Sequence, residues 1–363
     1  MKLLITYASA GAGHRRVAEA VYNYFKEQRP EVSLEMVDIL AKTNALFRFS
    51  YAKGYSFLVH YAVELWHFAF WLTEFKGLRP LTRFFAALSN RINTQGFAAY
   101  LIRKDPDYII STHFLPSEIA AHLKIKKKIS STVITIITDF GVHPFWISRG
   151  TDFYIVASDF TKDKLIAEGI AREKIKVFGL PSDIKFLREF DRASLSGKLG
   201  IRPDKFTVLL MTGSLGIGPL EELAALLCRD VQVLVVCAAN KKLYDRLNKR
   251  NLPNVKVFGF VNNTEELMAA CDIIVTKPGG STIAEVINMG LVPIFISVIP
   301  GQEEGNVEAL EEFGVSLTPK TVDAIKDMVL GFKNNPEKLQ EMQSRVQKLK
   351  KPFSCQELAG VIR

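Results

Sequence analysis

The sequence predicts an α/β protein built from two Rossmann-like, doubly wound domains. Short apolar runs alternate with segments of helical periodicity in both halves of the chain, as in β-α-β units around a parallel sheet. Glycine-rich turns follow several of these runs, and a length of 363 residues suits two domains better than one. The hydrophobic fraction of 48% and the charged fraction of 23% are ordinary for a globular protein and argue against extended disorder.

The expected strands are apolar runs bounded by polar or turn residues. In the first half they are Leu3–Ala8, Ser33–Val37, Tyr108–Ser111, Thr132–Thr138 and Phe153–Ala157, with an amphipathic helix at Arg15–Gln28. The second half has strands at Thr207–Met211, Val231–Cys237, Val255–Val257, Ile273–Thr276 and Val292–Ile296, and helices at Glu221–Leu227 and Thr282–Met289. Pro181 and the charged stretch after it mark the junction. We therefore predict one domain over residues 1–187 and a second over 188–363, whose last helix is free to pack back on the first.

Two features indicate a protein that stays in the reducing interior of the cell. The four cysteines lie far apart and form no Cys-x-x-Cys pair, which favours buried thiols over a disulfide framework or a zinc site. The start, Met1–Tyr7, lacks the apolar length of a signal peptide and leads at once into a glycine-rich loop. We interpret it as a buried strand.

The net charge of +9 is unevenly distributed. Residues 1–187 carry 25 Lys and Arg against 17 Asp and Glu, whereas residues 188–363 carry 22 against 21. A basic first half suits nucleic acid, anionic lipid or a phosphorylated ligand, or serves solubility alone. No nucleic-acid recognition motif is visible, so we expect no nucleic-acid partner.

An aromatic and basic insert interrupts the β-α rhythm at about residues 45–95. Thirteen aromatic side chains lie between Phe47 and Phe85, with Lys and Arg among them. The insert has three possible structures: a transmembrane helix, an aromatic core, or helices that lie in a membrane interface. A transmembrane helix over residues 55–73 would place Glu64 in the bilayer at a high free-energy cost.

Interfacial helices explain the composition of the insert best. Such helices place Trp and Phe among lipid headgroups and Lys and Arg against anionic lipid. We therefore expect a peripheral, monotopic protein on the cytoplasmic face of the cell membrane, bound to an anionic surface. The residues expected to contact lipid are Trp66, Trp71, Arg79 and Arg83.

The first glycine loop, Ser9–Arg15, connects the first strand to the first helix. Gly11 and Gly13 let a ligand approach the backbone, and the helix N-terminus favours anionic groups. The loop lacks the third glycine of the dinucleotide fingerprint and the lysine of a P-loop. His14 lies at its mouth, outside the carboxyl end of the strand, where it serves either as a general base or as a capping residue.

Asp139 follows the apolar strand Thr132–Thr138 and is the second candidate catalytic residue. It either orients His14, binds the acceptor together with His143 and Trp146, or forms a structural turn.

The turn at residues 276–285 has the richest pattern in the chain: strand, glycine turn, helix. Backbone N–H groups and two hydroxyls at the helix start suit a pyrophosphate, and a carboxylate one turn later suits ribose hydroxyls. The pattern therefore indicates a nucleoside diphosphate. The residues concerned are Lys277, Pro278, Gly279, Gly280, Ser281, Thr282 and Glu285.

Two further loops of the second half complete the predicted donor site. Gln302, Glu303, Glu304 and Asn306 suit recognition of several sugar hydroxyls, unless they form a solvated loop. The glycine loop at 212–218, with Gly213 and Ser214, is placed to wrap the phosphates from the other side. No cluster has metal-ligand spacing, so we expect no metal and no cofactor. Helix dipoles and Lys or Arg then stabilise the leaving diphosphate.

Taken in order, these motifs resemble the monogalactosyldiacylglycerol synthase and processive diacylglycerol glucosyltransferase group of glycosyltransferase family 28. The residues that carry the resemblance are Gly11–His14, Thr138–Phe140 with His143 and Trp146, Phe178–Pro181, Thr276–Gly280 and Pro300–Asn306. The resemblance implies a GT-B fold, with two Rossmann-like domains facing a cleft, and metal-independent inverting transfer from a UDP-sugar to a lipid hydroxyl.

The resemblance also implies residue roles. His14 is then the base, Glu285 binds ribose, and Gln302 and Glu303 contact the donor sugar. The loop that contains Phe260 and Val261 lies against the uracil. The acceptor is then diacylglycerol or a glycosyldiacylglycerol. The alternatives are an N-acetylglucosaminyltransferase acting on another lipid-linked acceptor and a UDP-sugar epimerase, and the donor hexose stays open.

Overall fold

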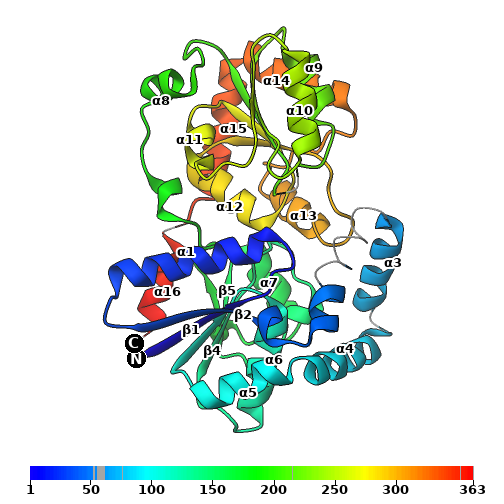
Figure 1. Cartoon of the computed structure of the whole chain (residues 1–363), viewed down its shortest axis with the longest axis vertical. Coiled ribbons are helices and arrows are strands. Elements are labelled where there is room, and N and C mark those ends of the chain that lie inside the picture. The colour runs from blue at the N-terminus through cyan, green and yellow to red at the C-terminus, as the bar shows by residue number, and fades with distance from the viewer. Residues whose placement is uncertain (52–53, 55–61, 76, 215, 352, 363) are drawn as a thin grey trace. The chain divides into compact units, whose positions relative to one another are not determined.

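The chain folds into two α/β units, which confirms the predicted fold class (Figure 1). The structure, a computed structural model, describes residues 1–51, 54, 62–75, 77–214, 216–351 and 353–362. Unit 1 comprises Met1–Asp183, Ile299–Ala309 and Lys351–Arg363. Unit 2 comprises Ile184–Val298 and Leu310–Lys350.

The division of the chain differs from the predicted one in two places. The short helix η4 (Ile184–Leu187), placed in the first domain by the sequence, belongs to unit 2. The segment Ile299–Ala309, placed in the second domain, belongs to unit 1. The reason is local packing: Gly305 approaches Gly141 so closely that a Cβ on Gly305 would lie 2.9 Å from the Gly141 Cα.

Unit 1 contains a six-stranded sheet in which every pair of neighbouring strands is parallel. Its strands, in sheet order, are β2 (Ser33–Asp38), β1 (Lys2–Tyr7), β3 (Tyr108–Ser111), β4 (Thr132–Ile136), β5 (Phe153–Val156) and β6 (Ile175–Val177). The central strands are apolar on both faces because helices cover both sides of a parallel sheet. β6 was not predicted, since three residues give too short an apolar run.

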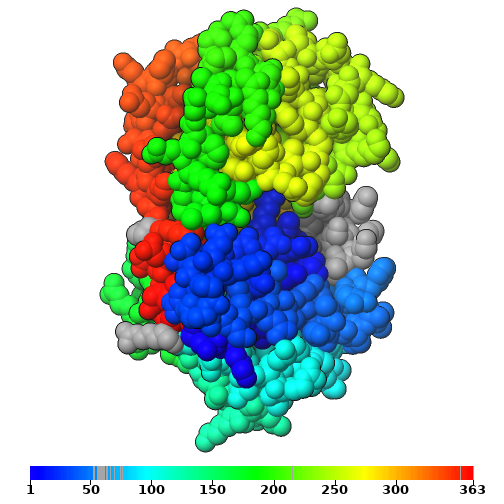
Figure 2. Space-filling model, turned by 60° about the vertical axis from the view of Figure 1, so that its left-hand side comes forward, coloured from blue at the N-terminus to red at the C-terminus, as the bar shows by residue number. Residues whose placement is uncertain are grey.

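The helices of unit 1 include the N-terminal helix and the last helix of the chain. They are α1 (Ala12–Gln28), η1 (Ile39–Lys42), α3 (Val63–Glu74), α4 (Arg79–Asn93), α5 (Gln95–Lys104), α6 (Phe114–Ile125), η2 (Pro144–Trp146), α7 (Asp159–Ala167), η3 (Arg172–Lys174) and α16 (Ser354–Val361). α16 packs against α1, and both figures of the whole chain show the red C-terminal segment beside the blue N-terminal one (Figures 1 and 2). The Ser354 hydroxyl donates a hydrogen bond to the Phe178 carbonyl at 2.8 Å.

Unit 2 contains a five-stranded parallel sheet of order β11-β10-β7-β8-β9. Its elements are α8 (Arg192–Leu199), β7 (Thr207–Met211), α9 (Leu220–Leu227), β8 (Gln232–Val236), α10 (Lys241–Arg250), β9 (Val255–Phe258), α11 (Thr264–Ala269), β10 (Ile273–Thr276), α12 (Gly280–Met289), β11 (Val292–Phe295), α14 (Val322–Asn334) and α15 (Pro336–Lys348). The chain passes from unit 1 to unit 2 within α13 (Glu304–Glu312).

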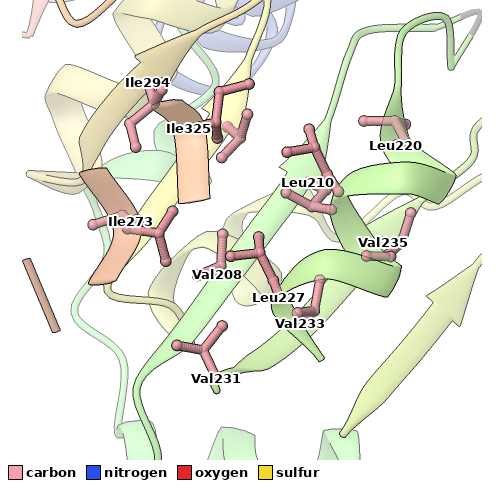
Figure 3. Close-up of a cluster of buried hydrophobic side chains, with 14 of the residues drawn as sticks. Val208, Leu210, Leu220, Leu227, Val231, Val233, Val235, Ile273, Ile294 and Ile325 are labelled. Carbon is pink, nitrogen blue, oxygen red and sulfur yellow. The ribbon is translucent and has the colours of Figure 1, made fainter. Parts of the chain in front are cut away.

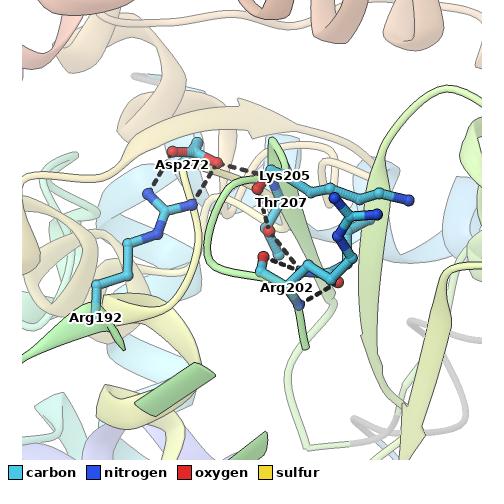
Figure 4. A network of polar contacts seen from close by, with 6 residues as sticks. Arg192, Arg202, Lys205, Thr207 and Asp272 are labelled. Carbon is cyan, nitrogen blue, oxygen red and sulfur yellow. Dashed lines mark hydrogen bonds and ion pairs between the residues drawn. The ribbon is translucent and has the colours of Figure 1, made fainter. Parts of the chain in front are cut away.

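A buried apolar cluster and a partly buried ion pair stabilise the sheet of unit 2. Figure 3 shows the cluster, in which Val208 of β7 and Val233 of β8 gather with Leu227 of α9. In Figure 4 the Arg192 guanidinium donates hydrogen bonds to both carboxylate oxygens of Asp272, with N–O distances of 2.6 and 2.9 Å. The same carboxylate accepts the N–H of Thr207 at the start of β7. This bidentate pair therefore fixes the start of the strand that leads to the glycine loop.

Candidate active site

The functional residues of unit 1 gather where the strand order of its sheet reverses, between β1 and β3. In open parallel sheets this is the place where neighbouring loops separate and ligands bind. The loop after β1 reaches α1 through Gly11, whose φ of 106° lies in the left-handed region that favours glycine. The loop after β3 carries Thr112 and His113 into α6. Both loops therefore open at the same edge.

His14 lies in the first turn of α1 and is held by the loop after β3. Its Nδ1 lies 2.9 Å from the Thr112 carbonyl oxygen and 2.8 Å from the Thr138 hydroxyl. The carbonyl only accepts, so Nδ1 carries the proton and Nε2 has the free lone pair. The Thr112 hydroxyl in turn donates a hydrogen bond to the His14 carbonyl oxygen at 2.8 Å. The side chain is thus fixed in the tautomer that a base requires.

A second histidine, His113, packs against the first. The two ring centroids are 4.5 Å apart, edge to face, and the Trp146 ring lies 6.1 Å from His14. Burial lowers the pKa of His14 to about 4, while the Thr112 carbonyl opposes this shift. Burial, and then the neighbouring His14, lower the pKa of His113 well below its usual value. Both imidazoles are therefore neutral at neutral pH.

Asp139 is tied to Asn306 rather than to His14. The Asn306 amide donates to the Asp139 carboxylate at 3.1 Å, and its oxygen accepts the N–H groups of Phe140 at 2.6 Å and Gly141 at 3.3 Å. Burial raises the pKa of Asp139 to about 6, and the bond from Asn306 opposes that shift. The residues that orient His14 are Thr112 and Thr138, which corrects the orienting role suggested for Asp139.

Asn306 also differs from its predicted role as a donor-sugar contact. Its exposed fraction is 0%, and its amide fixes the loop after β4. Glu303 is likewise buried, and one of its oxygens accepts the Ile299 N–H at 2.9 Å. Gln302 and Glu304 are more open and line the cavity described next. Polar composition alone does not reveal which side chains of a loop turn inward.

A cavity of about 720 Å³ opens beside His14 within unit 1. Its walls are largely aromatic and carry a few polar groups, as expected for a site that orients a small headgroup. Lys164, in the wall, is paired with Glu308 at 2.9 Å. This cavity is the candidate acceptor site. Its lining includes His14, Thr73 of α3, His113, Phe114, Asp139, His143, Phe145, Trp146, Gly301, Gln302, Glu304 and Gly305.

His143, predicted to contact the acceptor, has both ring nitrogens engaged. Nδ1 accepts the Phe145 N–H at 3.2 Å, so Nε2 carries the proton and donates it to the Thr73 hydroxyl at 2.8 Å. Burial, and then the charges of Arg79 and Arg83, lower the pKa of His143 to about 4. Because both nitrogens are engaged, the His143 ring can contact a ligand through its face but not through a hydrogen bond.

The aromatic insert forms helices α3 and α4 on the flank of unit 1 (Figure 1). Large apolar side chains are exposed along both: Leu65, Phe68, Trp71, Phe75, Leu78, Leu81, Phe84, Phe85, Leu88 and Ile92. The side chain of Trp66 lies outside the described residues, as do Lys53 and Lys76. No helix in the described part of the chain is long and apolar enough to cross a bilayer.

Arg79 and Arg83, predicted to contact lipid, both bond to other parts of unit 1. Arg79 forms an ion pair with Glu168 at 2.7 Å, and Arg83 donates to the Ile147 carbonyl at 2.8 Å. Arg91 on α4 and Lys126 directly after α6 are exposed cations, and their charges both lower the pKa of His122, after the larger effect of its burial. The partners of Arg79 and Arg83 are distant in the sequence, so the sequence pattern could not reveal these contacts.

The predicted diphosphate site of unit 2 lies at the matching edge, where its strand order reverses between β10 and β7. α12 begins at Gly280 with Gly279 as N-cap and no side-chain cap, so backbone N–H groups of its first turn are open to a ligand. The Thr212 and Thr276 hydroxyls, at the ends of the two strands, are buried with no hydrogen-bond partner among the described residues. Such unsatisfied groups favour a site that a polar ligand completes.

The other predicted donor residues surround this turn. Lys277, Pro278 and Ser281 to Glu285 lie in the turn and on α12, and Glu285 is almost fully buried. Gly213 has a φ of 79°, and the Ser214 carbonyl accepts the Ala239 N–H at 3.2 Å. Phe260 is 71% exposed after β9, whereas Val261 packs on the buried core. The described residues contain no group of three His, Cys, Asp or Glu that could hold a metal ion.

Residues 14–182 match the monogalactosyldiacylglycerol synthase family, and residues 207–357 match the C-terminal domain of glycosyltransferase family 28. The chain is 33% identical to a probable monogalactosyldiacylglycerol synthase of Glycine max, over 97% of this chain and 69% of that protein. It is 28% identical to a processive diacylglycerol β-glucosyltransferase of Staphylococcus saprophyticus, over 99% and 93% of the two chains. MurG of Acinetobacter baumannii shares the fold, with a TM-score of 0.61 at 14% identity, over 99% and 98% of the chains.

Proposed function

Because the chain belongs to the monogalactosyldiacylglycerol synthase family of glycosyltransferases, we propose that it transfers a hexose from a UDP-sugar to a lipid hydroxyl. The family inferred from the sequence motifs is thereby confirmed. The proposed acceptor is diacylglycerol or a glycosyldiacylglycerol, the lipid class named in the relatives. The proposed transfer inverts the anomeric carbon.

One observation supports this function above the others: His14 presents an unprotonated Nε2 beside an aromatic cavity. In the proposed reaction Nε2 takes the proton of the acceptor hydroxyl. The oxygen then forms a bond to the anomeric carbon, and the bond from that carbon to the UDP oxygen breaks on the opposite face. Positioned base catalysis of this kind typically supplies about 10²–10⁴-fold.

Unit 2 supplies the proposed donor site. The first-turn N–H groups of α12 and the Lys277 ammonium stabilise the departing diphosphate, and Glu285 accepts the ribose hydroxyls. The open helix start and the two unsatisfied threonine hydroxyls support this assignment. We propose that these groups take the place of a divalent ion.

We also propose that unit 1 docks peripherally on an anionic membrane from the cytoplasmic side. The support is the set of exposed apolar side chains on and between α3 and α4, among which few charged residues lie. Arg91 on α4 and Lys126 after α6 add exposed positive charge near this surface. Apolar side chains enter the headgroup boundary, and each nearby cation adds about 1 kcal/mol on an anionic surface. An acceptor that resides in the bilayer makes such docking necessary.

The test is an incubation of the full chain with each radiolabelled UDP-hexose, and with UDP-N-acetylglucosamine, on vesicles with and without diacylglycerol. The proposal expects labelled glycolipid only when diacylglycerol or its glycoside is present. A product from a different lipid-linked acceptor would point to the N-acetylglucosaminyltransferase alternative. Turnover of the UDP-sugar without any lipid, to its epimer, would contradict the proposed reaction.

A further inference from the structure

Helix α3 has two faces with different surroundings. Leu65, Phe68 and Trp71 are exposed along it, and Phe75 directly after it, each at about half of its surface or more. Phe70 and Thr73 instead line the cavity that contains His14. The same helix therefore faces the proposed lipid surface and the proposed acceptor.

The inner face of α3 makes one specific polar contact. The Thr73 hydroxyl accepts the proton of His143 Nε2 at 2.8 Å and donates its own proton to the Phe70 carbonyl at 2.6 Å. His143 uses Nδ1 to accept the Phe145 N–H, at the start of η2. The Phe145 N–H, the His143 ring, the Thr73 hydroxyl and the Phe70 carbonyl thus form a hydrogen-bond chain in which each donor and acceptor role is determined.

Phe70 adds an apolar contact to the same place. Its ring centroid lies 4.6 Å from that of His143. The ring also lies against Gly301, where an added Cβ would lie 2.5 Å from a Phe70 ring carbon. Gly301 has a φ of 77°, so both its conformation and its crowding require glycine. Through Phe70, α3 therefore packs against both His143 and the loop before α13.

The loop that His143 fixes also carries the other cavity groups. It begins at Asp139, whose carboxyl is held by Asn306, and ends at Trp146, whose ring lies 6.1 Å from that of His14. A displacement of α3 would therefore move the wall of the cavity on the side of the base. Misplacement of about 1 Å is enough to reduce turnover strongly.

We propose that Thr73 is a positioning residue: through His143 it ties the lipid-facing helix α3 to the wall of the acceptor cavity, so that seating α3 on lipid raises turnover. This inference rests on the proposed function. It predicts that a membrane surface stimulates transfer even to an acceptor that is dissolved in water.

The experiment measures transfer to a short-chain diacylglycerol below its critical micelle concentration, with and without acceptor-free phosphatidylglycerol vesicles. The variants are Thr73→Val, which keeps the shape and removes the bond to His143, and Thr73→Ser, which keeps the hydroxyl. Thr82→Val is the matched control, because Thr82 on α4 makes the same kind of bond to the carbonyl three residues before it, at 3.1 Å, and does not line the cavity.

We expect vesicles to stimulate the original protein, Thr73→Ser and Thr82→Val, and to leave Thr73→Val with about fivefold less stimulation, the effect of one ordinary hydrogen bond. Co-sedimentation with the vesicles should be unchanged in Thr73→Val, and the histidine ¹⁵N–¹H spectrum should show the His143 Nε2–H signal shifted upfield, as expected for a proton that has lost its hydrogen-bond acceptor, whereas Thr73→Ser should keep it in place. If Thr73→Val does not fold, Phe70→Leu replaces it with the same expectation.

Equal stimulation of Thr73→Val and Thr82→Val would overturn the inference, and so would an absence of stimulation in the original protein. Either result would leave transfer to diacylglycerol itself intact. Failure of the proposed function is different, because no variant would then form glycolipid under any condition.

Discussion

Replacing Asn306 by leucine tests the buried amide that joins α13 to the loop after β4. Leucine has a similar shape but leaves the Phe140 and Gly141 N–H groups without the acceptor that they now share at 2.6 and 3.3 Å. A buried group left without its hydrogen bond costs about 1–3 kcal/mol. Since the Gly141 bond is long and contributes less, we expect a loss of about 3 kcal/mol in the free energy of unfolding of unit 1.

The loss should also depend on pH, because Asn306 lowers the pKa of Asp139 against the effect of burial. The pKa of Asp139, about 6, lies above the ordinary aspartate value of 3.8, so protonation of this carboxyl stabilises the folded state. That stability is complete below about pH 4 and is lost as the pH rises through about 6. Without Asn306 the pKa of Asp139 rises further, and the variant loses more stability at pH 7 than at pH 5.

Thermal and urea unfolding of the full chain at both pH values measure this effect. A change of about 3 kcal/mol corresponds to a fall in Tm of about 10 °C for a unit of this size. Asn248→Leu is the control, because Asn248 is exposed on α10 and should change stability by less than about 0.5 kcal/mol. A loss below about 1 kcal/mol, or an equal loss at pH 5 and pH 7, would refute the reasoning.

Four other predictions concern activity and binding. His14→Ala should lower kcat at least about a hundredfold while UDP still binds, whereas His122→Ala, outside the cavity, should not; near-normal transfer by His14→Ala would exclude it as the base. Because the pKa of His14 is lowered to about 4, the activity that depends on its free Nε2 should persist as the pH falls through 6.5 and disappear near 4; a pH profile with a histidine limb at 6.5 would contradict this. Replacing Arg91 and Lys126 by alanine should weaken co-sedimentation with anionic vesicles by about fivefold per residue at low salt, with no effect on neutral vesicles. Glu285→Ala should weaken UDP binding in calorimetry by at least about tenfold, the value of one hydrogen bond to a charged group, and unchanged binding would remove Glu285 from the donor site.

The sequence was sufficient for features that are local along the chain. The two glycine turns, the strands before them and the helices after them follow from composition and periodicity. His14 could be assigned to the edge of a sheet because it follows a strand directly. The start of α12 is where the sequence placed an open helix N-terminus, and its role in binding a diphosphate stays a prediction.

The features that the sequence did not predict depend on contacts between distant segments. Thr112 and His113 join the site only because β3 pairs with β1, a pairing that no local pattern reveals. Thr73 meets His143 only because α3 folds back onto the loop after β4. Arg79 pairs with Glu168, which is also distant in the sequence. The place of each of these residues could be recognised only from its contact in the folded structure.

The composition of unit 1 from three separate stretches of chain has a consequence for how the protein is made. Asn306 and α16 belong to this unit, although some three hundred residues separate them from its first strand. Domains that are continuous in the chain mature on the ribosome in the order of their synthesis. Here the unit that contains His14 stays incomplete until α16 (Ser354–Val361) has been translated. A gene cut near codon 183 would yield a fragment that lacks α16 on α1 and the Asn306 amide on the Asp139 carboxylate. The chain crosses between the two units four times, so exchanging unit 1 with a relative requires four crossovers.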